Sequence, residues 1–260
     1  MKPFYFKQGT QPLLVSIPHA GTQLTPEVER GLTAEAAVLP DTDWHLPLLY
    51  DFAEELGASL LVANYSRFVV DLNRPADDTP LYTTATTGLF PETLFDGRPV
   101  FHPGQAPDSA TRQRYIEQIW QPYHQQIASE LSRLKALHGQ AFLYDAHSIA
   151  SVIPRLFDGP LPDINIGTND GRSCDPAISA AMCAVCGEQN AFSWVLNGRF
   201  KGGHITRHHG SPAQQQQAVQ IELAQLNYMD ETPPFTYRAE RAAELKRVLK
   251  QLLQAMLAQA

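Results

Sequence analysis

The chain has 260 residues, a net charge of −7 and 43% hydrophobic residues, an ordinary composition for a globular protein. It lacks a dense Lys/Arg block and an apolar run near the ~20 residues of a membrane-spanning helix, so we expect neither nucleic acid nor a membrane as partner. The length suits one α/β domain over residues 1–260, and an N-terminus too short and polar for a secretory signal favours the cytoplasm.

The first predicted element is an apolar strand within residues 12–21 that ends at a histidine. Pro18 lacks a backbone donor and so ends strand pairing, and His19 follows directly. In an open α/β sheet, reactive groups stand at the carboxyl ends of strands. A lone histidine there usually only hydrogen-bonds a neighbouring loop. A second apolar strand that carries a histidine near its end, in residues 141–148, favours a shared site instead.

Two aspartates and a histidine follow within five residues, at Asp41, Asp43 and His45. They directly precede residues 46–56, whose apolar residues recur at helical spacing. An aspartate just before a helix commonly caps its first turn, and we expect one of the two to do so.

Two further short strands are predicted over residues 58–64 and 67–72 from their apolar and β-branched residues. Arg74 comes just after the second of them, where a guanidinium can bind a substrate carboxylate through two hydrogen bonds. A structural ion pair with Asp71 or Asp77 is an equally weighted alternative.

Residues 76–107 show no sustained periodicity. So long an irregular stretch in a compact domain is more often a functional lid than a linker, although its closure over a site stays open. Several of its rings could line a pocket or anchor the loop to the core: Tyr82, Phe90, Phe95, Phe101 and His102.

The longest predicted helix covers residues 108–137, with a kink at Pro122. The next segment, residues 141–148, is an apolar strand that carries Asp145 and His147. A strand, a crossover helix and a second strand form the usual unit of a parallel sheet. Two strands with histidines at their ends therefore predict one shared site.

A helix is predicted over residues 175–187 and a strand over residues 191–197. Cys183 and Cys186 form a C-x-x-C pair within this helix. Such a pair can be a redox couple or half of a zinc site. We favour structural thiols, because the second half of a zinc ribbon is missing.

Residues 198–210 contain four glycines, three histidines and three cationic residues. Arg207 offers a fixed positive charge to a ligand, and a solvent-exposed basic hairpin is the alternative. The predicted strand over residues 215–226 carries Glu222 in its middle. A buried carboxylate there needs a hydrogen bond, an ion pair or a metal, or its pKa rises. An amphipathic helix from Arg238 closes the chain.

These residues suggest a catalytic metal site. His19 and His147 with Asp43 would form a three-ligand site for a divalent ion, with zinc favoured, that leaves a position for water. Glu222 could take the proton of that water, and two arginines could hold carboxylate groups of the substrate. A serine nucleophile is disfavoured, because Ser148 points to the opposite face from its neighbour and no G-x-S-x-G turn is present.

Six segments in this order resemble the N-formylglutamate deformylase (N-formylglutamate amidohydrolase) family. Each is weak alone, but the ordered set is specific and spans residues 16–231. They are SIPHAG at 16–21, DTDWH at 41–45, SRFVVDLNRP at 66–75, DAHS at 145–148, KGGHITR at 201–207 and QIELAQLNYMDE at 220–231.

The resemblance implies hydrolysis of N-formyl-L-glutamate to formate and L-glutamate, a step of histidine breakdown. The family is related to zinc carboxypeptidases and aspartoacylase. It therefore implies a phosphorylase/hydrolase-like α/β fold, a three-layer sandwich with a mixed sheet and helices on both faces. The acyl group, the native metal and the oligomeric state stay open.

The resemblance also implies residue roles. His19 and His147 take the two histidine ligand positions, and Glu222 takes that of the general base. Substrate carboxylates would be held by Asn73 and Arg74, and we add two candidates from KGGHITR, namely Thr206 and Arg207.

One departure concerns the acidic ligand. The carboxypeptidase pattern has Glu three residues after the first histidine, where this chain has Thr22. Asp43 is therefore an inference, with Asp41 and His45 as rivals. Two alternatives to the deformylase are a deacylase for other N-acyl amino acids and a non-catalytic protein that binds acidic metabolites.

Overall fold

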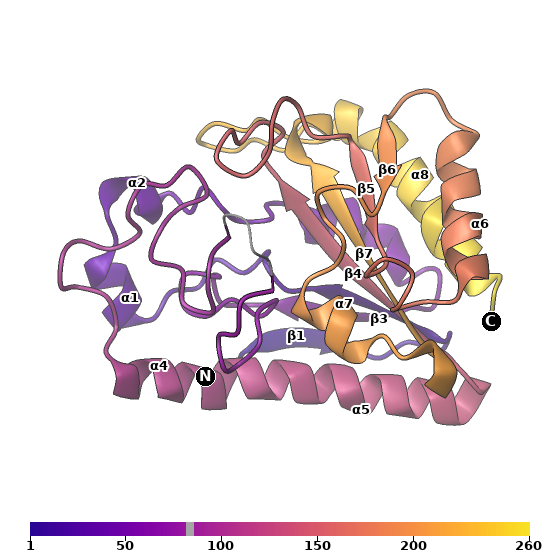
Figure 1. Cartoon of the computed structure of the whole chain (residues 1–260), viewed down its shortest axis with the longest axis horizontal. Helices are drawn as coiled ribbons and strands as arrows, with labels where there is room; N and C mark the ends of the chain where they lie inside the picture. Colours follow the sequence, from indigo (N-terminus) through magenta and orange to yellow (C-terminus); the bar gives the residue numbers. More distant parts are fainter. Residues whose placement is uncertain (82–85) are drawn as a thin grey trace.

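The computed structural model describes residues 1–81 and 86–260, and it is built on one seven-stranded sheet (Figure 1). The strands lie in the order β1-β3-β2-β4-β7-β5-β6. Their bounds are β1 Phe4–Lys7, β2 Leu13–Ile17, β3 Ser59–Ala63, β4 Ala141–Ile149, β5 Ile164–Gly167, β6 Trp194–Leu196 and β7 Gln216–Ala224. The α-helices are α1 Pro26–Gly31, α2 Ala34–Ala37, α3 Leu46–Leu49, α4 Ser109–Tyr115, α5 Gln121–His138, α6 Pro176–Gly187, α7 His204–His209 and α8 Ala239–Leu257.

The sheet is mixed, as predicted. The four central strands β3, β2, β4 and β7 run parallel, whereas β1 pairs antiparallel with β3 and β5 antiparallel with β7. Every residue of β2 and β4 is buried. Strands covered on both faces need apolar side chains in both directions, which explains why β2 and the first four residues of β4 are almost continuously apolar.

Helices cover both faces of the sheet, so the predicted three-layer arrangement is confirmed. The apolar faces of α3, α6 and α8 pack on one side, and α4, α5 and α7 pack on the other (Figure 1). Side chains alternate along a strand. Phe142 and Tyr144 of β4 join the α6/α8 layer, while Leu143 joins the α5 layer. Asp145 and His147 share the parity of Leu143 and therefore face the α5/α7 layer.

The long helix is confirmed, and it contains an irregular turn where a kink was expected. Asp108 caps α4 by accepting a hydrogen bond from the backbone N–H of Thr111 at 2.8 Å. Residues Ile116–Trp120 form a π-helical turn between α4 and α5. Pro122 follows at once, and a proline ring crowds the preceding helical turn and lacks an N–H. The wider π turn accommodates this ring, so the helix continues instead of breaking.

The strand predicted over residues 67–72 is wrong, because this segment forms turns. Val69 donates its backbone N–H to Ser66, and Asp71 donates to Leu89, so the segment pairs with no strand. Its apolar residues are buried in the α5-side core all the same: Phe68, Val69, Val70 and Leu72. Burial of a loop thus produced the β-branched run that had indicated a strand.

Several other helices and strands differ from their predicted bounds. The helix predicted over residues 46–56 is only α3 followed by a 3-10 turn at Asp51–Ala53. Neither aspartate caps α3, since His45 precedes it with a left-handed φ of 63°. The alternative of a basic hairpin over residues 198–210 is wrong, because α7 occupies its second half. The strand predicted over residues 191–197 shortens to β6, and β1 was not predicted.

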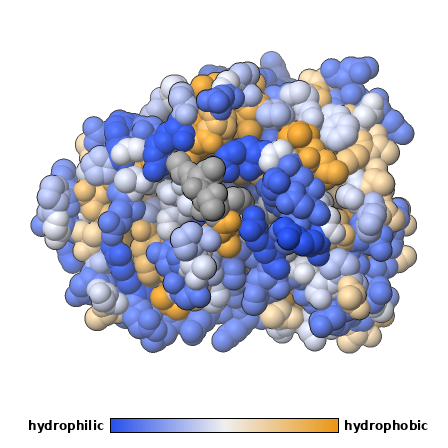
Figure 2. Space-filling model, viewed as in Figure 1, coloured by the Kyte–Doolittle hydropathy of each residue, from blue (hydrophilic) through white to orange (hydrophobic). Residues whose placement is uncertain are grey.

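Residues 76–107 contain no named helix or strand in their described part, as expected. Tyr82, one of the rings expected to line a pocket, lies outside the described residues. The face shown in Figure 2 is mostly hydrophilic, with strongly hydrophilic residues gathered near its centre over α7 and the neighbouring loops. Within residues 1–81 and 86–260, no helix combines the length and apolar character needed to cross a membrane.

Candidate active site

The site is built from neighbouring strands near their carboxyl ends. His19 follows β2 by two residues, and His147 lies near the end of β4. In the register of β4 and β7, His147 stands opposite Glu222, and Asp145 stands opposite Gln220. Paired residues of adjacent strands point to the same face. The parallel central sheet therefore delivers these side chains to one place, as the sequence predicted.

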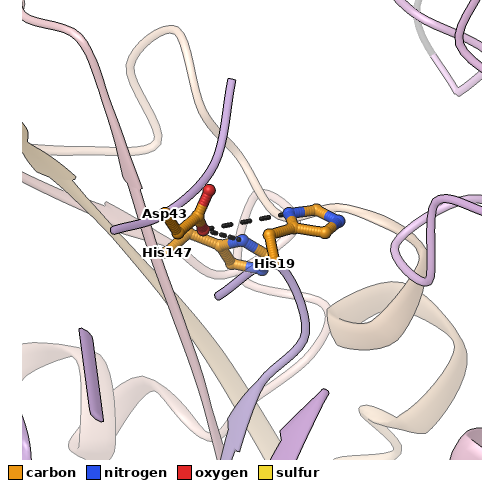
Figure 3. Close-up of side chains that lie close together, drawn as sticks. All are labelled: His19, Asp43 and His147. Carbon is orange, nitrogen blue, oxygen red and sulfur yellow. Dashed lines mark hydrogen bonds and ion pairs between the residues drawn. The ribbon is translucent and has the colours of Figure 1, made fainter. Parts of the chain in front are cut away.

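His19, Asp43 and His147 form a buried group (Figure 3). One ligand atom from each lies within 4.8 Å of the other two. The Oδ2 atom of Asp43 is 3.2 Å from Nδ1 of His147 and 3.8 Å from Nδ1 of His19. Asp43 comes from the loop before α3, and it is held there because its Oδ2 also accepts the backbone N–H of Ser148.

The far nitrogen of each histidine faces another carboxylate. Nε2 of His19 lies 2.8 Å from Oδ1 of Asp71, and Nε2 of His147 lies 3.2 Å from Oδ2 of Asp145. A carboxylate at this place fixes the ring and keeps the proton on Nε2, so that Nδ1 can bind a cation. Two imidazoles and a carboxylate with such partners fit a divalent metal.

The two rival ligands have other contacts. Oδ2 of Asp41 accepts the backbone N–H of Phe95 at 2.9 Å, and Nε2 of His45 lies 2.6 Å from the carbonyl of Phe235. Of the three candidates, Asp43 alone belongs to the group with both histidines.

The pKa values of the two histidines are shifted in opposite directions. Burial, reinforced by the positive charge of Arg67, lowers the pKa of His19. Burial also acts to lower the pKa of His147, but attraction from Asp145 and Asp43 outweighs it, and the pKa is raised well above its usual value. Carboxylates that attract a proton to His147 would equally attract a metal cation.

Glu222 is a buried carboxylate at the edge of this group. Burial raises its pKa to about 8, repulsion from Asp43 adds to this, and attraction from His147 opposes it. Its Oε2 accepts a hydrogen bond from Gln220 at 3.2 Å. A cation bound nearby would favour the ionised form and lower this pKa. The sequence predicted that a buried carboxylate in this strand would be hydrogen-bonded or have a raised pKa, and Glu222 shows both features.

Asn73 and Arg74 lie at the same pocket. Nδ2 of Asn73 is 3.1 Å from Nε2 of His147, and its Oδ1 accepts the N–H of Ile205. The guanidinium of Arg74 donates to the carbonyls of Thr87 and Asn73 and to the hydroxyl of Thr86. Arg74 makes no ion pair with Asp71 or Asp77 that would take it from the pocket.

Thr206 and Arg207 do not line the pocket. Thr206 is fully buried, and its hydroxyl donates to Oδ2 of Asp145 at 3.4 Å. Nε of Arg207 donates to the carbonyl of Gly202 at 2.8 Å. Both residues come from α7, whose helical turn carries them behind the site.

Two arginines of the pocket were missed by the sequence analysis. Arg67 lies in the turn segment and forms a buried ion pair with Asp71 at 2.6 Å. Arg199 lies between β6 and α7, and its Nε donates to the carbonyl of Leu156 at 2.8 Å. Arg199 belongs to the unusual segment 198–210, so composition indicated the segment but not which of its cations faces the pocket. Phe95 adds an apolar wall from the irregular loop.

A two-histidine, one-aspartate group beside a buried glutamate, at the carboxyl edge of a mixed α/β sheet, places the protein in the class of amidohydrolase-type enzymes. The model of the N-formylglutamate amidohydrolase family matches residues 11–229. The chain therefore belongs to the N-formylglutamate amidohydrolase family.

Similar proteins agree with this assignment. An N-formylglutamate deformylase of Pseudomonas aeruginosa is 62% identical over 97% of this chain and 95% of its own length. One of Pseudomonas putida is 60% identical over 99% of this chain and 96% of its own length. The crystal structure of an N-formylglutamate amidohydrolase from Ralstonia eutropha JMP134 has the same fold, with a TM-score of 0.83 at 24% identity over 98% of this chain and 96% of that one.

Proposed function

We propose that the chain hydrolyses N-formyl-L-glutamate to formate and L-glutamate. The observation that carries this proposal is the convergence of His19, Asp43, His147 and Glu222, from distant parts of the sequence, on one pocket. Relatives 62% and 60% identical over nearly the whole chain are named N-formylglutamate deformylases.

His19, Asp43 and His147 would hold a divalent metal, and their two imidazoles and one carboxylate favour zinc. A metal held there would supply Lewis acidity for the formyl carbonyl and for a water molecule. The ligand set is fixed by Asp71 and Asp145, which hold the two histidine rings. His19, Asp43 and His147 all line the pocket, where water and substrate would reach a bound metal.

Glu222 serves as the general base. Its carboxylate takes a proton from the attacking water, whose oxygen forms a bond to the formyl carbon. The carbon–nitrogen bond then breaks as Glu222 passes the proton to the leaving nitrogen. The formic acid released gives up its hydroxyl proton, so the final products are formate and glutamate with a protonated amine. Burial raises the pKa of Glu222 to about 8, and a carboxylate whose pKa lies nearer to neutrality accepts a proton from water more readily than an ordinary one.

The substrate carries two carboxylates, and the pocket offers two guanidiniums outside the Arg67–Asp71 pair. We assign one carboxylate to Arg74, supported by Asn73, and the other to Arg199. Charge-assisted hydrogen bonds from arginine suit carboxylates. Thr206 and Arg207, proposed from sequence for this purpose, support Asp145 and the Gly202 backbone from behind.

We also propose that the enzyme acts in the cytoplasm. The cysteines are free thiols, two of them buried on or next to α6 and Cys183 half-buried on it. Thiols without disulfides are usual for proteins of a reducing compartment.

The test of the proposed function measures formate release and metal content together. The purified protein should release formate from N-formyl-L-glutamate, lose this activity to a chelator, and regain it with added metal. Glu222→Gln should keep the bound metal and lose about 100-fold or more in kcat, because it removes the proton acceptor. Normal turnover by this variant would remove Glu222 from the mechanism, and a protein without any formate release would contradict the assigned reaction.

A further inference from the structure

The backbone between Leu72 and Arg74 is held from outside at three consecutive carbonyls. The Leu72 carbonyl lies 2.9 Å from Nε2 of His124. The Asn73 carbonyl accepts the backbone N–H of His204 at the start of α7, at 3.3 Å. The Arg74 carbonyl accepts the indole N–H of Trp120 at 2.9 Å. Such bonds restrict an irregular segment to one backbone conformation. This segment carries Asn73 and Arg74 into the pocket.

Two of these three donors are side chains one helical turn apart. Trp120 and His124 are spaced i, i+4, so they lie one above the other on the same side of the helix. Their rings stack with centroids 3.9 Å apart and an interplanar angle of 27°. Each ring orients the other, and both polar atoms then point at the same loop.

The protonation state of His124 is set by its neighbours. Nε2 must carry the proton that the Leu72 carbonyl accepts, so Nδ1 is an acceptor. Nδ1 of His124 lies 3.3 Å from Nε2 of His209 on α7. His209 thus donates to His124, and His124 donates to the loop. Burial keeps His124 in this neutral form by lowering its pKa well below the usual value.

The π-helical turn places Trp120 in this arrangement. The backbone N–H of Gln121 bonds to the carbonyl of Ile116, a five-residue span in place of the usual four. The extra residue rotates the helix before Trp120 relative to the part after it. Short π-helical turns are frequent at functional sites, and this one ends at the residue that binds the Arg74 carbonyl.

We infer that Trp120 and His124, here called the loop clamp, are positioning residues that fix Asn73 and Arg74 for substrate binding. They touch neither the substrate nor the metal ligands and act through the backbone of residues 72–74. This inference rests on the proposed function for the identity of the substrate. The hydrogen bonds that define the clamp do not depend on it.

The main test is Trp120→Phe, which keeps an aromatic ring on His124 and removes the N–H to Arg74. We expect KM for N-formyl-L-glutamate to rise about tenfold with a smaller change in kcat, because a misplaced guanidinium weakens substrate binding. Metal content and Tm should change little. The affinity for the product L-glutamate, measured by calorimetry, should fall with KM.

The matched control is Tyr123→Phe, on the same helix. It removes the buried hydroxyl that lies 3.0 Å from that of Ser16, whereas no hydrogen bond joins the Tyr123 side chain to residues 72–74, all of which the structure describes. This control should leave KM and glutamate affinity unchanged whatever its effect on Tm.

A second pair of variants separates positioning from packing. His124→Leu should weaken substrate and glutamate binding as Trp120→Phe does. His124→Gln should restore most of this binding, because its amide can donate to the Leu72 carbonyl. Variants that lower Tm but keep KM and glutamate affinity would overturn the clamp. A wild-type protein that binds glutamate but releases no formate would instead contradict the proposed function, and the binding measurements would still decide the clamp.

Discussion

Arg199 contributes to the pocket the positive charge that we assign to the side-chain carboxylate of the substrate. Its Nε is occupied by the Leu156 carbonyl, so the planar group is oriented before any ligand arrives. Arg74 is oriented in the same way, by Thr86, Thr87 and its own loop. Two preoriented guanidiniums favour a dicarboxylate over an amino acid with a neutral side chain, because hydrogen bonds from arginine to a carboxylate are stronger than those to a neutral group.

Arg199→Gln should therefore lower the preference for N-formyl-L-glutamate over N-formyl-L-glutamine by about 10- to 100-fold, the usual effect of one charged hydrogen bond. The two substrates have nearly the same shape and differ in the charge of the side chain. The ratio of their kcat/KM values therefore measures how strongly the pocket prefers the charged side chain. Arg172→Gln, which removes an exposed arginine paired with Asp170, is the control. Equal losses with both substrates would contradict the assignment.

Residue identity could be predicted from sequence only where a local pattern fixed it. His19 and His147 stood at the ends of buried strands, and parallel strands bring such ends together. Asp43 had two rivals within five residues, because the direction of a side chain in a loop depends on contacts with distant residues such as Phe95 and Phe235. Arg207 was proposed and Arg199 was not, because which arginine of this segment faces the pocket depends on α7, whose formation the sequence did not indicate.

At the scale of elements, α5 and α7 form a contact rich in histidine. The ring of His209 stacks on His124, and those of His204 and His208 lie beside them. Burial, with repulsion from His208 and His204, lowers the pKa of His209 to about 3. A proton on the buried His209 ring would place an unpaired positive charge in this contact, so His209 stabilises the fold while it is neutral.

The stability of the α5–α7 contact should therefore depend on pH. The unfolded chain takes up a proton at His209 near pH 6.5, whereas the folded chain does so only near pH 3. The contribution of His209 to the free energy of unfolding is therefore greatest above pH 6.5 and decreases as the pH falls towards 3. By pH 4.5 the loss should be about 3 kcal/mol, at about 1.4 kcal/mol per pH unit.

Denaturant unfolding of wild type and His209→Gln between pH 7 and pH 4.5 measures this loss. The variant should show a shallower dependence of the unfolding free energy on pH. His138→Gln, an exposed histidine of α5, should keep the wild-type slope. Identical slopes in all three proteins would show that His209 does not titrate as its surroundings require.

Most elements with strong periodicity or clear end signals were predicted, including α5, α6, α8, β4 and β7. Residues 67–72 were not, because β-branched residues also occur in buried loops, and only the missing partner strand separates the two cases. β1 is a short edge strand with alternating exposure, which gives a weak signal over four residues. Helix α7 is six residues long with no side-chain cap, so little in its sequence marks its start.

At the scale of the whole molecule, the three proposed metal ligands tie together segments that are far apart in the chain. His19 follows β2, Asp43 precedes α3, and His147 lies in β4. The unfolded chain does not hold these three together, so a metal binds the folded state selectively and stabilises it.

Bound metal should therefore raise Tm. At a free concentration of one hundred times Kd the stabilisation is about 2.7 kcal/mol, or roughly 5 to 10 °C for a chain of this size. Thermal unfolding with zinc and with a chelator measures the difference. His19→Ala should abolish most of it, and a variant that still responds fully would exclude His19 as a ligand.

The position of β7 has a consequence for how the chain is made. It is the last strand to leave the ribosome, yet it lies between β4 and β5 in the sheet. Until residue 224 has been synthesised, the nascent polypeptide presents open edges of both strands, to which another polypeptide can add by strand pairing. The greatest risk of aggregation therefore falls during translation, when timely assistance from chaperones matters more than the thermodynamic stability of the finished enzyme.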